Sequence, residues 1–538
     1  MLVYDIVIAG YGPTGAVVAN LMGAQGHRVL VIEPELDIYD IPRAVHFDGE
    51  IMRIFQDLGL AQEINGLASP GEMLKFVNGR GWTLFQQDLS VVKRQHAWFN
   101  NLFFDQPRLE NCLRNGVQRY PNIEERLGWL VTDLGSQTSD AEVFDLQISP
   151  VSQQSVAGNT EQIRTRYLLA CDGASSPVRK LLDIDQEDLH CDEPWLVCDL
   201  ILKKGTRFNR TALQICDPKR PASLIPCDSE HIRWEFMIDA KDDTEAMENE
   251  EYVRELMSKH IHRLSPDIKR SDGELIRAKV YTFHALISDR FQSGKVFLLG
   301  DAAHQMPPFL GQGMCAGMRD AYNLCWKLNG VLAGQFAQSV LNTYTTERRP
   351  QVRNVVETAV AHGAIIQTRN PLKAFIRDSY LMLGKALPFL VGFLKFGEGW
   401  QLGQGLFFSE TDAELKRPVG EPIPQGWISK LPLTTSTPPI LSDCLLSDRF
   451  TVVGFDIDPK PFLIEANAND WLDTLFIGEK GQFIEVEGEL MNWANENEVA
   501  LAIIRPDRQV YGICKKGAVA THQLSRILDV LDRQLHPT

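Results

Sequence analysis

The sequence predicts an α/β protein: a Rossmann-like parallel sheet with an inserted antiparallel sheet, then a helical segment and a small C-terminal α/β domain. Three observations support this prediction. The N-terminal stretch up to Glu33 has the pattern of a β-α-β unit with a glycine-rich turn. Two later apolar strands also run into turns that contain glycine. The stretch "HIRWEFMID" (231–239) alternates apolar and charged side chains, which is typical of a strand in an antiparallel sheet.

The first unit begins with an apolar strand from Asp5 to Ala9. A glycine-rich turn follows, and Thr14 to Gln25 are rich in Ala, Val and Leu, as expected of a buried helix. A second apolar strand runs from Arg28 to Ile32 and ends at Glu33. The spacing is that of a tight β-α-β crossover, which places both strands parallel in one sheet.

Two further strands join this sheet from distant parts of the chain. The strand "RYLLAC" (Arg166–Cys171) runs into Asp172-Gly173, and Ser176 and Pro177 then provide helix-start signals. The strand Val296–Leu299 runs into Gly300-Asp301 and a loop with two prolines. Apolar residues then recur at helical spacing up to Leu328. Each of the three strand ends therefore carries a turn suited to holding a ligand.

The remaining segments are assigned from their periodicity and composition. We expect roughly Cys191–Tyr281, with part of Met73–Gln106, to form the inserted antiparallel sheet, and residues from Thr343 to about Phe407 to be helical. Stretches rich in Pro, Gly and Thr after residue 415 predict a linker. Short apolar strands and an amphipathic helix follow it. The predicted segments are 1–72, 107–190 and 282–342 for the nucleotide domain, 73–106 and 191–281 for the inserted sheet, 343–414 for the helices and 415–538 for the last domain.

Composition excludes several classes of function. The formal net charge of −16 argues against nucleic acid and anionic membrane surfaces as partners. The most apolar later window, "LMLGKALPFLVGFLKF", is broken by Lys385 and Pro388 and is too short to cross a bilayer. Ten cysteines lack a CxxC pair or metal-ligand spacing, so we expect reduced thiols, a cytoplasmic protein and no metal site.

The first turn has the pattern of an adenine-dinucleotide site. Gly10, Gly12 and Gly15 form a G-x-G-x-x-G between a strand and a helix, and Glu33 ends the next strand at about the expected distance. Gly10 permits the turn, Gly12 lets a pyrophosphate approach, and Gly15 permits close helix packing. Glu33 would accept hydrogen bonds from a ribose 2′-hydroxyl and repel a 2′-phosphate. The motif indicates FAD or NAD and does not distinguish them.

The three turns together resemble those of the single-component flavin-dependent aromatic hydroxylases, the group A flavoprotein monooxygenases. The GxGxxG, DG and GD motifs of that family match Gly10-Gly12-Gly15, Asp172-Gly173 and Gly300-Asp301. Further similarity lies in "GDAAHQMPPFLGQGM", "PRAV", "FDQPRLE" and "YTTERRP", in the same order over about 400 residues. The C-terminal part resembles the thioredoxin-like domain of many relatives without its CxxC. Within the family, "IRWEFM" and "ELIRAKVYTFHA" are most similar to the 3-(3-hydroxyphenyl)propionate hydroxylases.

This resemblance implies an enzyme that binds FAD, uses NADH or NADPH as a transient co-substrate, and reacts with O₂ through a flavin C4a-hydroperoxide to hydroxylate an aromatic ring. Asp301 would bind ribityl hydroxyls, and the helix opened by Gly311 and Gly313 would stabilise negative charge on the reduced flavin. The resemblance and the glycine motif together assign cofactor binding to Gly10, Gly12, Pro13, Thr14, Gly15, Glu33, Arg43, Gln106, Asp172, Gly300, Asp301, Pro308, Gly311, Gln312, Gly313 and Met314.

The residue that activates the substrate is not evident from the sequence. His284, Tyr281 and His46 are candidates, and Pro307 is expected beside the reacting face of the flavin; Arg233 and His304 are further candidates. Trp234 and Phe236 are expected either to line an aromatic pocket or to pack within the sheet.

One departure from the family pattern concerns the substrate. Leu286 stands where the resemblance leads us to expect an arginine, so a propionate-type phenolic acid and a polycyclic or heteroaromatic substrate both remain open. An NAD-dependent dehydrogenase and a non-catalytic flavin-binding scaffold are competing hypotheses from different functional classes. Packing or a homodimer contact is the role expected of the last domain.

Overall fold

The structure is a computed structural model of the 538-residue chain. It describes residues 2–40, 42–90, 96–135, 142–151, 160–206, 208, 210–228, 230–239, 241–242, 247, 249–261, 273–394, 401–409, 415–432, 438–465, 472–517 and 520–537. Parts of the predicted helical segment and linker, residues 395–400, 410–414 and 433–437, lie outside these ranges.

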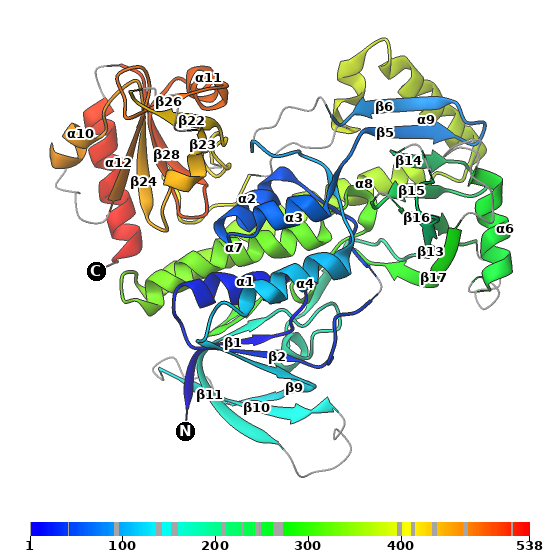
Figure 1. The fold of residues 1–538 in the computed structure, drawn as a ribbon, viewed down its shortest axis with the longest axis horizontal. Coiled ribbons are helices and arrows are strands. Elements are labelled where there is room, and N and C mark those ends of the chain that lie inside the picture. Colours follow the sequence, from blue (N-terminus) through cyan, green and yellow to red (C-terminus); the bar gives the residue numbers. More distant parts are fainter. Residues whose placement is uncertain are drawn as a thin grey trace.

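A mainly parallel sheet forms the centre of the molecule (Figure 1). Its strands are ordered β19-β20-β11-β1-β2-β8, and neighbours from β20 to β8 run parallel. The hairpin strands β9 and β10 extend the sheet beside β11. The bounds are β1 Val3–Ala9, β2 Val29–Glu33, β8 Ile123–Leu127, β9 Trp129–Leu134, β10 Phe144–Pro150, β11 Glu161–Ala170, β19 Gln292–Ser293 and β20 Val296–Leu298. The predicted parallel sheet built from distant segments is therefore confirmed.

Helices cover one face of this sheet because its strands are apolar on both sides. The strand β2 is buried throughout, and so are the last four residues of β11. The helices α1 (Pro13–Ala24), α4 (Gln106–Val117) and α7 (Gly313–Leu332) lie together on one face, with α2 (Gly49–Asp57) and α3 (Ala61–Leu67) beyond them (Figure 1). The helix after the second turn, α5, is short and spans Pro177–Leu181, with Ser176 at its N-cap as predicted.

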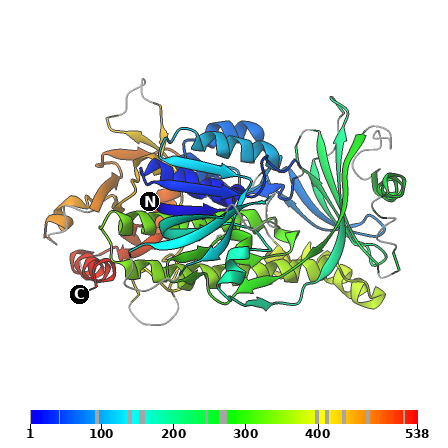
Figure 2. The same ribbon diagram turned by 90° about the horizontal axis from the view of Figure 1, so that it is seen from below.

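A second sheet stands at the far end of the molecule (Figure 2). Its seven strands are ordered β17-β13-β16-β15-β14-β5-β6. The prediction of a purely antiparallel insertion is wrong in one respect, because β14 and β5 come from distant segments and pair in parallel. The bounds are β5 Met73–Asn78, β6 Thr83–Asp88, β13 Glu193–Leu202, β14 Thr211–Cys216, β15 Ala222–Pro226, β16 His231–Met237 and β17 Gly273–Phe283.

The two faces of the second sheet differ in what covers them. Trp234 and Phe236 stack with ring centroids 5.6 Å apart and belong to a core that includes Val253 and Met257 of α6 (Glu250–Ile261). The helix α6 lies on the side of the second sheet away from the central sheet (Figure 2), so the pair packs on this outer face. Of the two roles expected for this pair, the structure therefore supports packing within the sheet. The alternate residues of β16 face the central sheet instead.

Smaller strands join the two large sheets. A three-stranded sheet is ordered β3-β7-β4, and another is ordered β12-β18-β21. In the second of these, Leu286 on β18 pairs with Asp188 and Gln305. The bounds are β3 His46–Phe47, β4 Ser69–Pro70, β7 Leu102–Phe103, β12 Gln186–Asp188, β18 Leu286–Ser288 and β21 His304–Gln305.

Two long helices and a third sheet complete the chain. The predicted helical segment consists of α8 (Thr343–Ile366), α9 (Pro371–Gly384) and the 3₁₀ helix η6 (Pro388–Leu394). The described residues 401–409 are not helical, so the prediction of helix as far as Phe407 is wrong at that end. The third sheet is ordered β23-β22-β26-β25-β24-β27-β28. Its elements are β22 Trp427–Lys430, β23 Ile440–Leu441, β24 Phe450–Phe455, α10 Lys460–Glu465, β25 Leu472–Ile477, β26 Phe483–Glu485, α11 Glu489–Glu496, β27 Val499–Ile504, β28 Val510–Lys515 and α12 Ala520–Leu535.

Buried ion pairs attach the third sheet to the helices of the central region. Glu347 of α8 accepts hydrogen bonds from Lys327 of α7 and from Arg505, which follows β27, and all three side chains are buried. Arg53 of α2 forms a bidentate pair with Asp443. Unpaired, such charges would be costly in the interior, so these contacts fix one docking geometry. Among the described residues, every helix is too short or too polar to cross a membrane.

Candidate functional site

The predicted turns meet at one edge of the central sheet. Strands β1, β2, β11 and β20 are parallel and adjacent, so their carboxyl ends lie side by side. This edge therefore carries Gly10, Glu33, Asp172 and Asp301. In open α/β sheets, ligands bind in the crevice outside the carboxyl ends of the strands. With about 4.8 Å between neighbouring strands, β2 and β20 are roughly 14 Å apart, which suits an extended dinucleotide.

The glycine turn leaves space only at its middle glycine. Gly10 has φ of +97°, and a Cβ there would lie 2.3 Å from the carbonyl oxygen of Cys171. A Cβ on Gly15 would lie 2.1 Å from the carbonyl oxygen of Gly10. A Cβ on Gly12 would meet no atom within 4 Å, although Gly12 directly precedes α1. The structure thus separates two packing glycines from one that faces open space in front of a helix N-terminus, where phosphates bind.

Two neighbouring residues of the turn have packing roles. Pro13 occupies the first position of α1. The Thr14 hydroxyl lies against Gly300 and Gly317, where a Cβ would approach it to 2.9 and 2.4 Å. Thr14 therefore joins the first turn to the third, and its backbone is the part available to a ligand.

The Glu33 side chain, predicted to bind the ribose, also holds the backbone of the glycine turn. Its carboxylate accepts hydrogen bonds from the backbone N–H groups of Tyr11 at 2.6 Å and of Glu35 at 3.0 Å. A carboxylate has about four acceptor positions, so two of them remain for ribose hydroxyls. The predicted cofactor role is compatible with this geometry.

In the second turn, the two carboxylate oxygens of Asp172 have different surroundings. Asp172 Oδ2 accepts a hydrogen bond from the backbone N–H of Val178 and caps α5. Within the described part of the chain, the buried Oδ1 has no partner, and burial raises the pKa of this carboxyl. Arg179 braces the turn by donating to the carbonyl oxygens of Ala174 and Ala302. Asp172 therefore holds the turn in place and leaves one oxygen for a ligand.

The third turn presents an acid in a recess. Asp301 is exposed to solvent, yet burial raises its pKa, against the opposing effects of His304 and Arg43. Both observations hold for a carboxylate that has protein atoms around it but is open to solvent on one side, and we call its surroundings the Asp301 recess. Among the described residues, nothing forms a hydrogen bond with it. This is the environment expected for an acid that binds ligand hydroxyls.

A buried network fixes the shape of the third turn. Asp320 accepts hydrogen bonds from the backbone N–H of Gly300 at 3.0 Å and from Arg348 at 2.7 Å, and it pairs with His304. Burial alone would raise the pKa of Asp320, but His304 and Arg348 lower it. His304 Nε2 is therefore occupied by a structural hydrogen bond with Asp320.

The proline loop leads from this turn to α7. Pro307 is buried and Pro308 is half-buried at the start of a 3₁₀ turn that ends at Gly311, whose φ is +64°. The side chain of Gln312 is tied to Asp48 and Arg319, so only its backbone is free. Because α7 begins at Gly313, the first N–H groups of the helix, including that of the half-buried Met314, point out of its N-terminus toward this loop.

A second loop, at residues 42–44, is held from two sides. The Gln106 side-chain oxygen accepts hydrogen bonds from the backbone N–H groups of Arg43 at 2.7 Å and Ala44 at 2.6 Å. From the second sheet, Arg233 donates to the carbonyl oxygens of Pro42 and Arg43. Gln106 was predicted to bind the cofactor. In the structure its side-chain oxygen holds the backbone of Arg43, so it would act on the cofactor through the position of Arg43.

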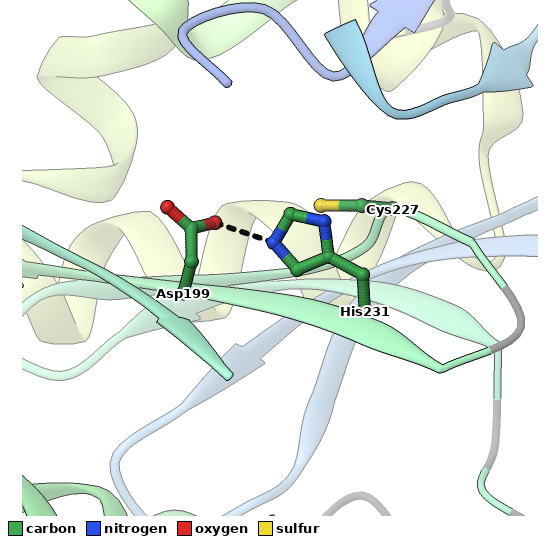
Figure 3. Close-up of side chains that lie close together, drawn as sticks. All are labelled: Asp199, Cys227 and His231. Carbon is green, nitrogen blue, oxygen red and sulfur yellow. Dashed lines mark hydrogen bonds and ion pairs between the residues drawn. The ribbon is translucent and has the colours of Figure 1, made fainter. Parts of the chain in front are cut away.

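Arg233 is itself oriented by a buried charge cluster. Asp199 pairs with Arg233 at 3.0 Å and with Arg277, and it accepts a hydrogen bond from His231 at 2.8 Å (Figure 3). Asp199, His231 and Cys227 have ligand atoms within 4.8 Å of one another. Two guanidinium groups on the same carboxylate disfavour a divalent cation there, and burial raises the pKa of the Cys227 thiol. The cluster therefore orients Arg233, which anchors the second sheet to the loop.

The catalytic candidates fall in different places. His46 is buried beside Gly311, and its ring nitrogens lie 3.3 Å from the Gly311 carbonyl oxygen and 3.1 Å from Asn101 Oδ1. Burial lowers the pKa of His46, so the ring is neutral at physiological pH. Tyr281 is half-buried and pairs across the sheet with Trp195. His284 is 41% exposed and pairs with Asp192, so the structure brings it to the surface rather than to the recess.

These features fit FAD. The open space at Gly12 suits a pyrophosphate, Glu33 has spare acceptor positions, and Asp301 is an unpartnered acid in the recess. The N-terminus of α7 supplies N–H groups beyond the third turn. A dehydrogenase that uses only the first motif would leave the Asp301 recess and the proline loop without a purpose.

Comparison with known proteins decides the family. A family profile described as "FAD binding domain" matches residues 3–359. The chain is 31% identical over 534 residues to the 3-(3-hydroxy-phenyl)propionate/3-hydroxycinnamic acid hydroxylase of Burkholderia cenocepacia (strain HI2424), covering 94% of this chain and 93% of the relative. The chain belongs to the family of FAD-dependent aromatic hydroxylases. FAD is accordingly its cofactor, and it is an enzyme.

Other members of the hydroxylase family match along nearly the whole chain. The probable NADH-specific resorcinol 4-hydroxylase of Rhodococcus jostii (strain RHA1) is 31% identical over 549 residues, covering 99% of this chain and 97% of the relative. The flavin-dependent monooxygenase PieE, solved in complex with FAD and substrate, superposes with a TM-score of 0.80 at 19% identity over all of both chains. Aklavinone-11 hydroxylase, solved with FAD and aklavinone, gives 0.77 at 20% identity over 99% of both. These two structures show that the mixed α/β fold is shared.

Sequence reasoning missed the residues that hold the hydroxylase site together. Asp199, Asp320 and Arg179 fix Arg233, Gly300 and the second turn, respectively. No motif marks Asp199 of β13, because its partners come from two other strands, β16 and β17. Asp320 ends the stretch "GMRD" (317–320), and helical spacing could have placed it about two turns inside the helix that follows the third turn.

Proposed function

We propose that this hydroxylase uses NADH and O₂ to hydroxylate a benzene ring that already carries a hydroxyl group. The observation that carries the proposal is the meeting of the Asp301 recess, the proline loop and the second sheet at one edge of the central sheet. The named activities of the hydroxylases from Burkholderia cenocepacia and Rhodococcus jostii support a phenolic substrate, and the NADH-specific one supports NADH over NADPH.

The chain's own residues would bind the cofactor and orient the ring. FAD, when bound and reduced by NADH, would supply the activation of O₂, from which one oxygen atom enters the ring and the other leaves as water. The residues from Gly10 to Gly15 and Glu33 would hold the adenosine half, and Arg43 and Asp301 the diphosphate and ribityl parts. The N-terminus of α7 would stabilise negative charge on the ring. Pro307 and Phe309 would border the reacting face, and Phe309 packs against Trp195 with ring centroids 5.6 Å apart.

His46 is the candidate for a proton acceptor near the reacting ring. It is neutral, and it touches the loop that would face the flavin. A neutral imidazole can donate from Nδ1 to the Gly311 carbonyl oxygen and accept a phenolic proton on Nε2, which requires the Asn101 side chain, 3.1 Å from Nε2, to turn aside. Exclusion of water by the apolar residues around Phe309 would protect the activated oxygen from unproductive loss.

The finer architecture is part of the proposal. Residues 1–72, 107–190 and 282–342 would form a Rossmann-like FAD-binding domain, and 73–106 and 191–281 a substrate domain. The last domain would be thioredoxin-like, supported by parallel β24 and β25, antiparallel β27 and β28, and the terminal helix α12. Its two cysteines, Cys444 and Cys514, are unpaired, so thiol exchange gains no support. A cytoplasmic location and a homodimer complete the proposal.

Purified protein supplies the test. The wild type should carry flavin absorbance, and its NADH oxidation should rise severalfold when a phenolic substrate is added, with a product heavier by one oxygen atom. An equal NADH oxidation rate with and without resorcinol, 3-(3-hydroxyphenyl)propionate and larger polycyclic phenols, together with no product, would refute the proposed activity.

A further inference from the structure

A row of polar side chains lies on the inner face of the second sheet. Glu235 of β16 is cross-strand neighbour of Ser223 of β15, and Ser223 is neighbour of Gln214 of β14. Neighbours of this kind have Cβ atoms about 5 Å apart on the same face. All three side chains are more than nine-tenths buried. Ser223 donates a hydrogen bond to the Gln214 side-chain oxygen at 2.7 Å.

The outer members of this row lack partners. Among the described residues, the Glu235 carboxylate accepts no hydrogen bond, and the Gln214 side-chain nitrogen donates none. Neither the Glu235 oxygens nor the Gln214 side-chain nitrogen is among the fully shielded polar atoms of the described residues that lack a partner, so these atoms reach accessible space beside the sheet. Unused hydrogen-bonding groups that face accessible space beside the FAD-binding region point to a ligand that completes the row.

The position of Glu235 on the strand places the row beside the flavin site. Two residues before it, Arg233 binds the loop at Pro42 and Arg43. Two residues after it, Met237 belongs to the apolar cluster that contains Trp195 and Phe309 of the proline loop. Side chains two apart on a strand share a face. Glu235 thus lies between the two contacts that attach the second sheet to the cofactor loops, facing the FAD-binding region.

The chemistry of the row selects among phenolic ligands. Burial raises the pKa of Glu235, with Arg233 acting in the opposite direction. A ligand carboxylate placed here would put two acids in one buried site, where both cannot ionise without a large penalty. A neutral hydroxyl can donate to Glu235 and accept from the Gln214 amide. The cations near Glu235, Arg233 and Arg277, are already paired with Asp199, and Leu286 on β18 adds no further cation for a ligand carboxylate.

We propose that Glu235, Ser223 and Gln214 form the subsite that recognises a second hydroxyl group on the ring, so that the enzyme prefers neutral dihydroxybenzenes to phenolic acids. This inference rests on the proposed function and narrows its substrate class. It assigns Glu235 as a specificity-determining residue that contacts the second hydroxyl group of the substrate.

The test compares two probes, resorcinol and 3-(3-hydroxyphenyl)propionate, on holoenzyme. The wild type should show a kcat/KM at least tenfold higher for resorcinol, and Glu235→Gln should reduce this ratio at least tenfold while retaining the flavin spectrum. In the wild type the preference should weaken as the pH falls through the raised pKa of Glu235, and the variant should lack that dependence. Glu274→Gln, an exposed position on β17 of the same sheet, is the matched control and should leave the ratio unchanged.

The outcomes separate the two proposals. A wild type that prefers the acid, or a Glu235→Gln ratio within twofold of the wild type, would overturn the subsite while leaving the hydroxylase activity intact. A wild type that hydroxylates neither probe nor any larger phenol would overturn the proposed function and the subsite together. Where Glu235→Gln fails to bind FAD, Ser223→Ala carries the test: it should lower kcat/KM severalfold for resorcinol only, and equal loss for both probes would contradict the subsite.

Discussion

Two glycines of the first turn should respond to alanine in opposite ways. Gly10 is held at φ of +97° against the carbonyl oxygen of Cys171, whereas Gly12 has φ of −68° and open space where a Cβ would stand. Gly10→Ala should therefore disturb the folded apoprotein. Gly12→Ala should leave the apoprotein nearly unchanged and weaken FAD binding.

The magnitudes follow from the geometry. An alanine at positive φ costs about 1–2 kcal/mol, and the 2.3 Å approach to a backbone oxygen forces a further shift, so Gly10→Ala should lose at least about 2 kcal/mol. At Gly12, a cost of up to about 1 kcal/mol at the N-cap is offset by about 0.4–1 kcal/mol of reduced unfolded-state entropy. Loss of one hydrogen bond to a charged phosphate is worth about 1.5–3 kcal/mol, or roughly a 10- to 150-fold increase in Kd for FAD.

The assay measures both properties on the same samples. Apoprotein stability is read from denaturant unfolding, and the Kd for FAD from the change in flavin fluorescence on binding. Gly66→Ala is a matched control, because a Cβ there also meets no atom within 4 Å and the residue lies in α3, away from the strand ends. If Gly12→Ala binds FAD as tightly as the wild type, the space at Gly12 does not receive the pyrophosphate, and the assignment of this turn is refuted.

Two further predictions concern the supports of the site. Arg233→Met should raise the Kd for FAD, because it removes the anchor of the loop at residues 42–44, and it should lower the unfolding free energy by about 3 kcal/mol, because buried Asp199 loses one of its cations. Fluorescence titration with FAD and urea unfolding measure these two quantities. An unchanged Kd would show that Arg233 does not anchor the loop. His96 is buried beside Arg53, and its pKa is lowered to about 3. In the unfolded chain His96 takes up a proton near pH 6.5, whereas in the folded chain it stays neutral down to about pH 3. The free energy of unfolding should therefore fall as the pH drops from about 6.5 toward 3. His96→Gln should flatten this part of the pH profile of urea unfolding. An identical profile in the variant would show that His96 does not govern it.

Much of the central sheet could be predicted because its signals are local. The strand ending at Ala9 and the turn after it have the continuous apolar pattern and the glycine spacing that are typical of a dinucleotide-binding β-α-β unit. The same holds for Ser176 at the N-cap of α5, where the side-chain cap and the following proline act within one turn. Local chemistry of this kind survives in the sequence as a readable motif.

The parts that were wrong or missed depend on contacts between distant segments. The parallel pairing of β14 with β5 joins residues about 140 positions apart, and periodicity within either strand does not reveal the partner's direction. Alternation in "HIRWEFMID" identified the two faces but not which one faces the cofactor; Trp234 is on the outer face and Glu235 on the inner one. Which face an inserted sheet turns inward is decided by docking, as through Arg233, and not by the strand itself.

The most direct test of the account is the Kd for FAD of Asp301→Ala. Asp301 faces the recess without a hydrogen-bond partner among the described residues, so its removal should cost the hydrogen bonds to ribityl hydroxyls, about 1.5–3 kcal/mol, and raise the Kd at least tenfold without loss of apoprotein stability. Asp529→Ala on the exposed side of α12 should leave the Kd unchanged. An Asp301→Ala protein that retains FAD as tightly as the wild type would contradict the convergence of the three turns on one cofactor.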